Sequence, residues 1–390
     1  MLKGRFEGEA LVAYYFLYFC ALGAFMPYWG PWLQARGQDA LAIGILTAAV
    51  QFSKVLAPNV WGWLLHYLPA RRLIPAAGVA TLLSFSLLFF AGDHFALLLL
   101  VTVLFAFFWA AALPLVDTFS MAWAERHGRR YGRIRLWGSI GFIALSLGMG
   151  ALVARWGLQS FLPTITLFLL FVVVASRYLP LQDHHPQQAA EGQGTFLPAL
   201  RDSRLWFFLA AGILEQSSHG VYYAFYSIYV EQHGHGSLSV GVLWALAVCA
   251  EVLFFWFGER VLARWGIALC FSSAFVLTAL RWMVIAWWPG FVWIVLVQTL
   301  HAASYAAFHL AAIHWVFARF SPALRARGIA LYASLVYGLG GGLGSLAAGW
   351  TWSHWGGSGA FLAAGIVSGS AALLLFGMFR PARSGLEKPA

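Results

Sequence analysis

The chain has 390 residues, of which 61% are hydrophobic and only 10% are charged. Soluble domains carry charge on roughly a quarter of their residues, so this composition excludes a soluble protein and predicts an all-α integral membrane protein. The net charge of +10 would suggest a nucleic-acid partner in a soluble protein. Here the basic residues fall in short clusters between apolar runs, so we expect the lipid bilayer as partner and no nucleic acid.

Twelve apolar runs are long enough to cross the roughly 30 Å of hydrocarbon in a bilayer. They lie near residues 11–34, 40–67, 73–92, 95–124, 134–154, 160–180, 204–230, 237–262, 266–288, 290–318, 326–352 and 357–379. The most polar stretch, Gln182 to Gly194, separates the sixth run from the seventh. We therefore predict an N-terminal six-helix half over residues 1–181, a cytoplasmic linker over 182–203 and a C-terminal six-helix half over 204–390.

The loops predict the orientation. Twelve spans place both termini on one side, where twenty Lys and Arg residues fall, whereas the other side has only Arg36 and Arg155. Because positive loops stay in the cytoplasm, we expect both termini there. The first span lacks a small-residue cleavage site and is expected to be retained.

A weak internal repeat relates the two halves. Gly37 and Gly44, at the junction of the first two spans, recur as Gly234 and Gly241 at the junction of spans seven and eight, at an offset of 197 residues. The same offset carries Lys54 onto Glu251. Parallel repeats of this kind build a common class of transporter, whose substrate site lies at the midplane between the halves.

Five acidic or basic residues, counting Asp, Glu, Lys and Arg, lie deep within predicted spans. An ionisable group at the centre of a span costs about 2.5 to 3.5 kcal/mol, so those that remain usually face a cavity or a partner. Arg135, at the start of the fifth span, supplies a further cation. The alternative is that these charges form structural ion pairs or reach the membrane surface. The five are Lys54, Asp117, Glu215, Glu251 and Arg281.

Span seven carries a polar and aromatic stripe. His219, Tyr222 and Tyr226 follow Glu215 at i+4, i+7 and i+11, so all four share one helical face. We expect this face to line the cavity; the alternative is hydrogen bonding between helices.

Span ten carries three histidines, which change charge near neutral pH: His301, His309 and His314. Their spacings do not place all three on one face, and no cysteine or carboxylate accompanies them. The three cysteines, Cys20, Cys249 and Cys270, show no paired or zinc-like spacing. We expect no metal and no cofactor, with the proton as coupling ion.

Span five opens with YGRIRLWGSIG over residues 131–141, and its Arg135 lies eighteen residues after Asp117. This arrangement, with FLYFCALGAFMPYWGPWL over residues 16–33, resembles the lactose permease group of the major facilitator superfamily. The resemblance implies that Asp117 and Arg135 correspond to that group's sugar-binding pair. It also implies that Arg281 and His301 correspond to its proton-coupling cluster.

The sequence is more similar still to the bacterial phenylpropionate permease family. The segments that carry this similarity are YGRIRLWGS, HGVYYAFYSIY, WALAVCAEV and LHAASYAAFHLAA. The resemblance implies a major facilitator fold in the bacterial inner membrane and proton symport of a small solute. The expected substrate is an aromatic acid such as 3-phenylpropionate, and such bundles usually act as monomers.

Two positions depart from these families. Ser304 stands where the lactose permeases have their proton-carrying glutamate, so proton coupling must use another acid or be absent. His66 stands where the gating motif of the superfamily usually has Asp. The predicted gating loop therefore comprises Gly62, His66, Arg71 and Arg72.

The candidate site residues divide into two groups. The substrate-binding candidates are Lys54, Asp117, Arg135, Tyr222, Tyr226 and Arg281. The proton-coupling candidates are Glu215, His219, Glu251 and His301.

Three other functions remain open. A sugar or nucleoside symporter is favoured by Asp117 and Arg135 and disfavoured by the few Asn and Gln residues within the spans. An exporter of lipophilic compounds is disfavoured by the buried charges. A membrane enzyme would need a nucleophile or metal motif, and the sequence contains neither GxSxG nor HExxH.

Overall fold

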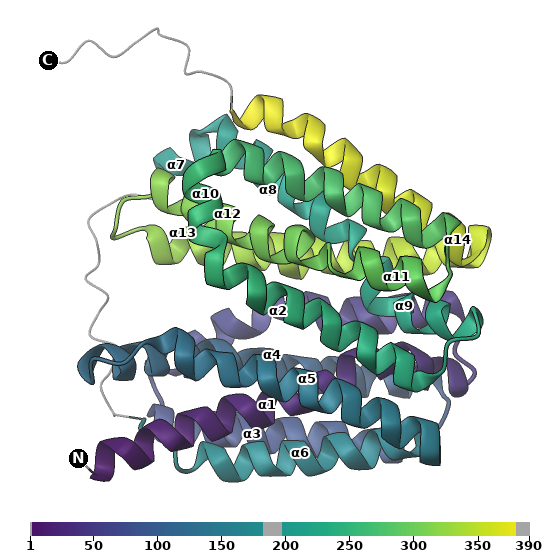
Figure 1. The fold of residues 1–390 in the computed structure, drawn as a ribbon. Helices are drawn as coiled ribbons and strands as arrows, with labels where there is room; N and C mark the ends of the chain where they lie inside the picture. The colour runs from purple at the N-terminus through teal and green to yellow at the C-terminus, as the bar shows by residue number, and fades with distance from the viewer. Residues whose placement is uncertain (1, 182–196, 380–390) are drawn as a thin grey trace, which may run out of the picture.

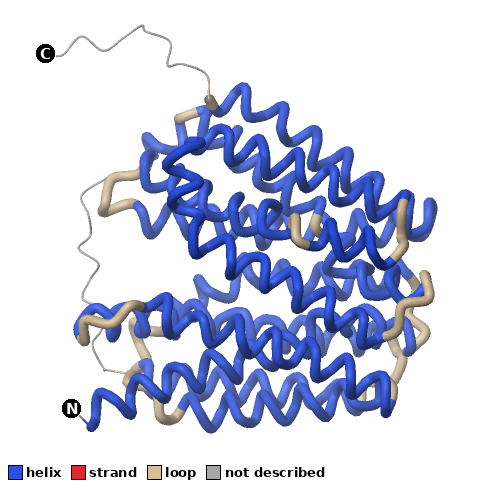
Figure 2. Tube along the Cα trace, viewed as in Figure 1, coloured by secondary structure: helices blue, strands red, loops and turns tan. Residues whose placement is uncertain are grey.

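The computed structural model describes residues 2–181 and 197–379. All secondary structure in these two ranges is helical, and short turns join the helices (Figure 2). The predicted linker sequence Gln182–Gly194 lies outside the described residues, so the boundary between the halves stays a prediction.

The N-terminal half contains six long helices, the third and sixth each with one short 3₁₀ turn. They are α1 (Leu2–Ala35), α2 (Ala40–Leu64), α3 with η1 (Ala70–Ser86, Leu87–Phe89), α4 (Phe95–Arg126), α5 (Tyr131–Trp156) and η2 with α6 (Leu158–Ser160, Phe161–Ser176).

The C-terminal half is more interrupted. Its helices are α7 (Leu197–Arg201), α8 (Ser203–Ser218), α9 (Gly220–Gln232), α10 (Ser237–Trp287), α11 (Phe291–Gln298), η3 (Ala302–Ala307), α12 (Phe308–Arg319), α13 (Arg325–Tyr332), η4 (Ala333–Gly340) and α14 (Gly341–Met378). Both η3 and η4 are π-helical.

Within the described residues, nine helical stretches are long and apolar enough to cross a membrane. Two of these, 237–287 and 325–375, have 51 residues each, or about 75 Å at 1.5 Å per residue, which is enough for two crossings. Each contains a glycine with positive φ, Gly266 at 74° and Gly356 at 69°, where the helix folds back (Figure 1). Span seven is divided at His219 into α8 and α9, each too short to be counted alone. With these three corrections the described helices account for the twelve predicted spans.

The two halves pack through equivalent helices. Between the halves α5 packs on α10, and α2 packs on α14. The first contact joins spans five and eight, and the second joins spans eleven and two. Span eleven is the fifth span of the second half and span eight is its second span, so the two contacts are equivalent in the two halves. The start of α1 and the end of α14 lie on the same side of the bundle (Figure 1), as an even number of spans requires.

Glycines permit the closest contacts between the halves. A Cβ at Gly44 would lie 2.8 Å from the carbonyl oxygen of Ser345 in α14, and a Cβ at Gly241 would collide with the carbonyl oxygen of Ser146 in α5. Only a residue without a side chain lets two backbones approach this closely. The second glycine of each repeat, Gly44 or Gly241, therefore makes an equivalent contact between the two halves. Both lie near the helix ends remote from the termini, so the bundle is closed on that face.

We predict that Gly241→Leu opens this face, because the new side chain keeps α5 and α10 apart. Opening is measured by labelling a cysteine placed at Ala224, in a protein whose native cysteines are replaced by alanine. Ala224 is buried on the same face, where its backbone meets Gly30 of α1. Labelling by a membrane-impermeant maleimide should rise severalfold.

The matched control is Gly132→Leu in α5, because no heavy atom lies within 4 Å of a Cβ at Gly132. Equal labelling in the two glycine variants would show that the Gly241 contact does not hold this face closed.

Candidate functional site

Arg281 lies at the centre of a polar network in the C-terminal half. It belongs to the second segment of α10, and its side chain is fully buried. Its Nη1 donates to Nδ1 of His301 at 2.8 Å and to Oγ of Ser304 at 3.1 Å, and its Nη2 donates to Oε1 of Gln298 at 2.9 Å. The guanidinium also stacks on the ring of Tyr222, 4.6 Å from the ring centre. Both terminal nitrogens are thus engaged by neutral groups.

His301 connects Arg281 to an acid. Its Nε2 lies 2.7 Å from Oε1 of Glu251, in the first segment of α10. A guanidinium can only donate hydrogen bonds, so Nδ1 of His301 must accept and Nε2 must carry the proton that is donated to Glu251. The contacts therefore describe a neutral His301 between a cation and a carboxylate. Protonation of Nδ1 would break the contact with Arg281.

The local structure of span ten makes this network possible. Helix α11 ends at Gln298, the chain passes through a tight turn, and η3 continues as a π-helix from Ala302. The interruption directs Gln298, His301 and Ser304 towards the same arginine. Interruptions of this kind are frequent at functional sites.

Glu215 and His219 lie in a separate buried cluster. Oε2 of Glu215 accepts a hydrogen bond from Ser368 at 2.5 Å, whereas Oε1 has no hydrogen-bond partner among the described residues. His219 donates from Nδ1 to the carbonyl oxygen of Glu215 at 3.0 Å, whereas its Nε2 has no hydrogen-bond partner among the described residues. Its ring packs against the ring of His301 at 6.3 Å, so the two clusters touch.

The predicted stripe of span seven continues across the interruption at His219, because the backbone of this residue stays in the αR region with φ −78° and ψ −7°. Tyr222 and Tyr226 lie on α9 beyond this break, and both are buried against Trp244. The hydroxyl of Tyr222 accepts a hydrogen bond from Gln298, whereas that of Tyr226 has no partner in the described residues.

The cations of the N-terminal half are engaged differently from Arg281. Lys54 is exposed in the middle of α2, and its Nζ donates to the amide oxygen of Gln51. Arg135 is half-buried and lies over the ring of Phe19, 4.0 Å from its centre. No ion pair in the described ranges involves either cation.

Asp117 is held by two tyrosines and not by Arg135. It accepts hydrogen bonds from the hydroxyls of Tyr15 at 2.5 Å and Tyr131 at 2.7 Å. Across the interface, Arg135 and Arg281 both interact electrostatically with the Glu251 carboxylate. The charge of Arg135 therefore attracts the Glu251 carboxylate, which belongs to the polar network of the C-terminal half.

The predicted gating residues lie together at the end of α2. His66 is exposed in the turn between α2 and α3, with Nδ1 3.1 Å from the carbonyl oxygen of Trp63. Arg71 and Arg72 are exposed in the first turn of α3. Gly62 lies in the last turn of α2, in open space.

Sequence reasoning missed several members of these clusters. Gln298 could have been noticed as an amide inside an apolar span, three residues before His301. The two tyrosines on Asp117 carried no signal of their own, because only the packing of α1 and α5 on α4 brings them there. In the part of the chain that the structure describes, no group of three His, Cys, Asp or Glu side chains could hold a metal ion.

The chain is similar to known transporters over most of its length. The family model described as the MFS_1 like family matches residues 10–363. The "Probable 3-phenylpropionic acid transporter" of Escherichia coli (strain K12) is 32% identical over 315 residues, which cover 78% of this chain and 81% of the relative. The maltose permease of Geobacillus stearothermophilus is 25% identical over 350 residues, or 88% of this chain and 87% of the relative.

Solved transporters share the fold. The crystal structure of the nucleoside transporter NupG superposes with a TM-score of 0.78 at 20% identity, over 96% of this chain and 99% of that one. The POT family transporter PepTSo gives 0.74 at 12% identity, over 95% and 96%. At these identities the likeness shows the major facilitator fold alone. Taken with the family match, it shows that this chain belongs to the MFS_1 like family and is a multi-pass membrane transporter, not an enzyme.

Proposed function

We propose that this protein is a proton-coupled symporter that takes up a small aromatic carboxylate, such as 3-phenylpropionate. It acts as a monomer in the bacterial inner membrane, with both termini in the cytoplasm. The observation that carries the proposal is the chain of contacts from Arg281 through His301 to Glu251. The substrate class is supported by the relative named for 3-phenylpropionic acid.

Charge balance links the proton to the substrate. Glu251 is the carboxylate on which both Arg281 and Arg135 act. When Glu251 is protonated, the two arginines lose this compensation in a poorly solvated interior, where an uncompensated charge is costly. A substrate carboxylate supplies the missing negative charge. Proton and substrate therefore stabilise each other's binding, which is the requirement for symport.

The N-terminal half is the better anchor for the substrate carboxylate. Arg281 is fully buried with both terminal nitrogens engaged, whereas neither Arg135 nor Lys54 forms a direct ion pair among the described residues. A guanidinium binds a carboxylate through two parallel hydrogen bonds, which favours Arg135. The Phe19 ring beside it offers an apolar face for the substrate ring.

Glu251→Gln is expected to abolish accumulation of labelled 3-phenylpropionate driven by an imposed proton gradient in proteoliposomes. The amide keeps the shape but cannot cycle a proton, so exchange of internal for external substrate should persist. Asp117→Asn and Glu215→Gln, measured alongside, test the other two buried acids.

Glu259→Gln is the matched control, because Glu259 is a 68% exposed acid on the same helix. Undiminished accumulation by Glu251→Gln would overturn the role of Glu251. Undiminished accumulation by all three buried-acid variants would overturn proton coupling through these acids.

Arg135→Gln is expected to weaken binding of 3-phenylpropionate about 10- to 100-fold, the usual effect of losing a charge-assisted hydrogen bond of roughly 1.5 to 3 kcal/mol. Binding of the uncharged 3-phenylpropionamide should change little, because it lacks the carboxylate. Isothermal titration of the purified protein measures both. Arg155→Gln, near the opposite end of α5, is the control, and equal losses for the two ligands would argue against carboxylate recognition by Arg135.

A sugar or nucleoside is the second candidate substrate. It is favoured by Asp117, which accepts hydrogen bonds from two tyrosine hydroxyls, and by the similarity to a maltose permease. Competition of maltose and uridine against labelled 3-phenylpropionate separates the two classes. Uptake of a sugar or nucleoside, without uptake of the aromatic acid, would establish the second candidate.

A further inference from the structure

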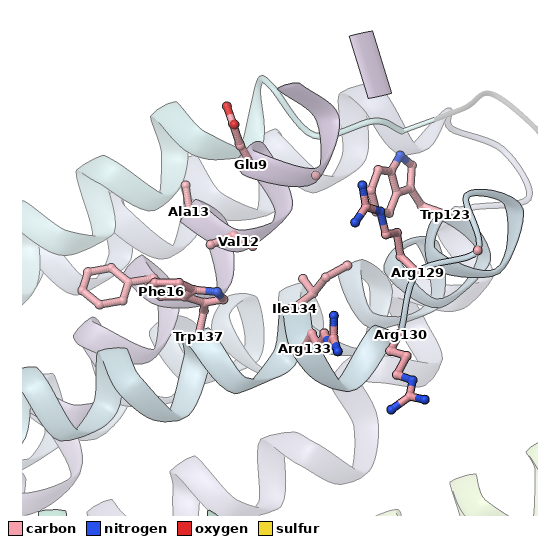
Figure 3. Close-up of a pocket in the computed structure, with 12 residues that line it drawn as sticks. Glu9, Val12, Ala13, Phe16, Trp123, Arg129, Arg130, Arg133, Ile134 and Trp137 are labelled. Atoms are coloured by element: carbon pink, nitrogen blue, oxygen red, sulfur yellow. The ribbon is translucent and has the colours of Figure 1, made fainter. Parts of the chain in front are cut away.

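A large cavity lies apart from the polar network, within the N-terminal half. It has a volume of about 790 Å³ and opens between the first turns of α1, the end of α4 and the start of α5. Figure 3 shows that its arginines gather at one end, next to the loop between α4 and α5, whereas Phe16 and Trp137 lie at the other end. The cavity therefore has a basic end, where Trp123 also lies, and an opposite end lined by Phe16 and Trp137, here called the aromatic end.

The basic end holds three arginines without carboxylate partners. Arg129, Arg130 and Arg133 line the cavity, and none of them forms an ion pair within the described ranges. Other arginines of the chain do find acids: Arg36 lies 3.4 Å from Asp93, and Arg319 lies 2.9 Å from Asp202.

The charge around the cavity is unbalanced. Glu9 is the one acidic residue among those that line it. The first turn of α5, beginning at Tyr131, adds the positive end of a helix dipole. An anion in this cavity would therefore be stabilised by several groups at once.

The aromatic end opens onto the lipid-facing side of α5. Trp137 is nine residues from Ser146, or about 900° at roughly 100° per residue, which places it on the opposite side of the helix. The backbone carbonyl of Ser146 contacts Gly241 of α10 in the other half, and its Oγ donates to the carbonyl oxygen of Gly23 in α1, so this side of α5 is covered by protein. Leu136, Trp137 and Ile140 are 41%, 43% and 39% exposed, as expected for side chains that contact lipid.

We propose that this cavity binds the headgroup of an anionic phospholipid. The phosphate lies among Arg129, Arg130 and Arg133, where planar guanidinium groups can each donate two hydrogen bonds to phosphate oxygens. The acyl chains follow the apolar surface of α5 past Leu136 and Ile140. Basic pockets between spans are a recurrent form of lipid headgroup site.

The general preference of positive residues for cytoplasmic loops explains why arginines occur in this loop. It does not explain why three of them surround one cavity whose other end is apolar and faces lipid. A free phosphate ion would use the arginines and leave the apolar end without a role. The arrangement as a whole fits an amphipathic ligand held at the membrane surface.

The test is native mass spectrometry of the purified full chain, titrated with phosphatidylglycerol or with phosphatidylcholine of the same acyl chains. The intact protein should retain phosphatidylglycerol in a saturable site and bind phosphatidylcholine at least tenfold more weakly. The combined substitution of Arg129, Arg130 and Arg133 by glutamine should weaken phosphatidylglycerol binding at least tenfold. The matched control replaces Arg260, Arg264 and Arg327, which are exposed outside the cavity, and should bind like the intact protein.

Ala13→Trp provides an independent test that keeps all three arginines. Ala13 lines the cavity, so the larger side chain should displace the lipid and produce a comparable loss. Equal binding by the cavity and control variants would overturn the proposal, and so would full retention of lipid by Ala13→Trp. Displacement of the lipid by glycerol 3-phosphate at equal concentration would also overturn it, because the apolar end would then contribute nothing.

Discussion

A permanent positive charge inside an apolar bundle is the constraint on which the C-terminal half depends. Arg281 cannot lose its proton under physiological conditions, and its side chain is fully buried. The surrounding helices supply an amide, a hydroxyl and an imidazole as acceptors for its two terminal nitrogens, and aromatic rings on its faces, whereas its Nε has no hydrogen-bond partner among the described residues. The interruption of span ten between Gln298 and Ala302 is the backbone arrangement that delivers three of these groups. Loss of one hydrogen bond in such a network is costly, because a polar group without a partner is destabilising in low dielectric.

The charged side chains of the two halves are compensated in different ways. In the C-terminal half a cation, a neutral histidine and an acid compensate each other within one network. In the N-terminal half neither Arg135 nor Lys54 forms a direct ion pair within the described ranges, and Asp117 accepts hydrogen bonds from tyrosine hydroxyls. The internal repeat thus relates backbones more closely than side-chain chemistry: the glycine contacts are equivalent in the two halves, but Lys54 and Glu251 have opposite charges and different partners.

The sequence predicted the membrane class and the twelve spans because length and apolarity alone decide whether a segment can cross lipid. The meeting of Arg281 with His301 could be expected from a family resemblance. The link from His301 to Glu251 could not, because it joins two spans whose relative rotation depends on packing. The break at His219 was also missed. A Cβ at the next residue, Gly220, would collide with the backbone of Gly344, so the position of this break reflects a contact with a distant part of the chain.

This break gives the two pieces of span seven different neighbours. Helix α8 packs on α14 and η4 of its own half, whereas α9 also packs on α1 of the other half, where Gly30 meets the backbone of Ala224. We expect the joint at His219 and Gly220 to act as a hinge, because the pieces on its two sides have different neighbours. Bending there would let α9 stay in contact with α1 while the rest of the C-terminal half rotates. The closed face of the bundle could then open at a different time from that rotation. Because the ring of His219 touches that of His301, this hinge also lies beside the groups that we propose sense the proton.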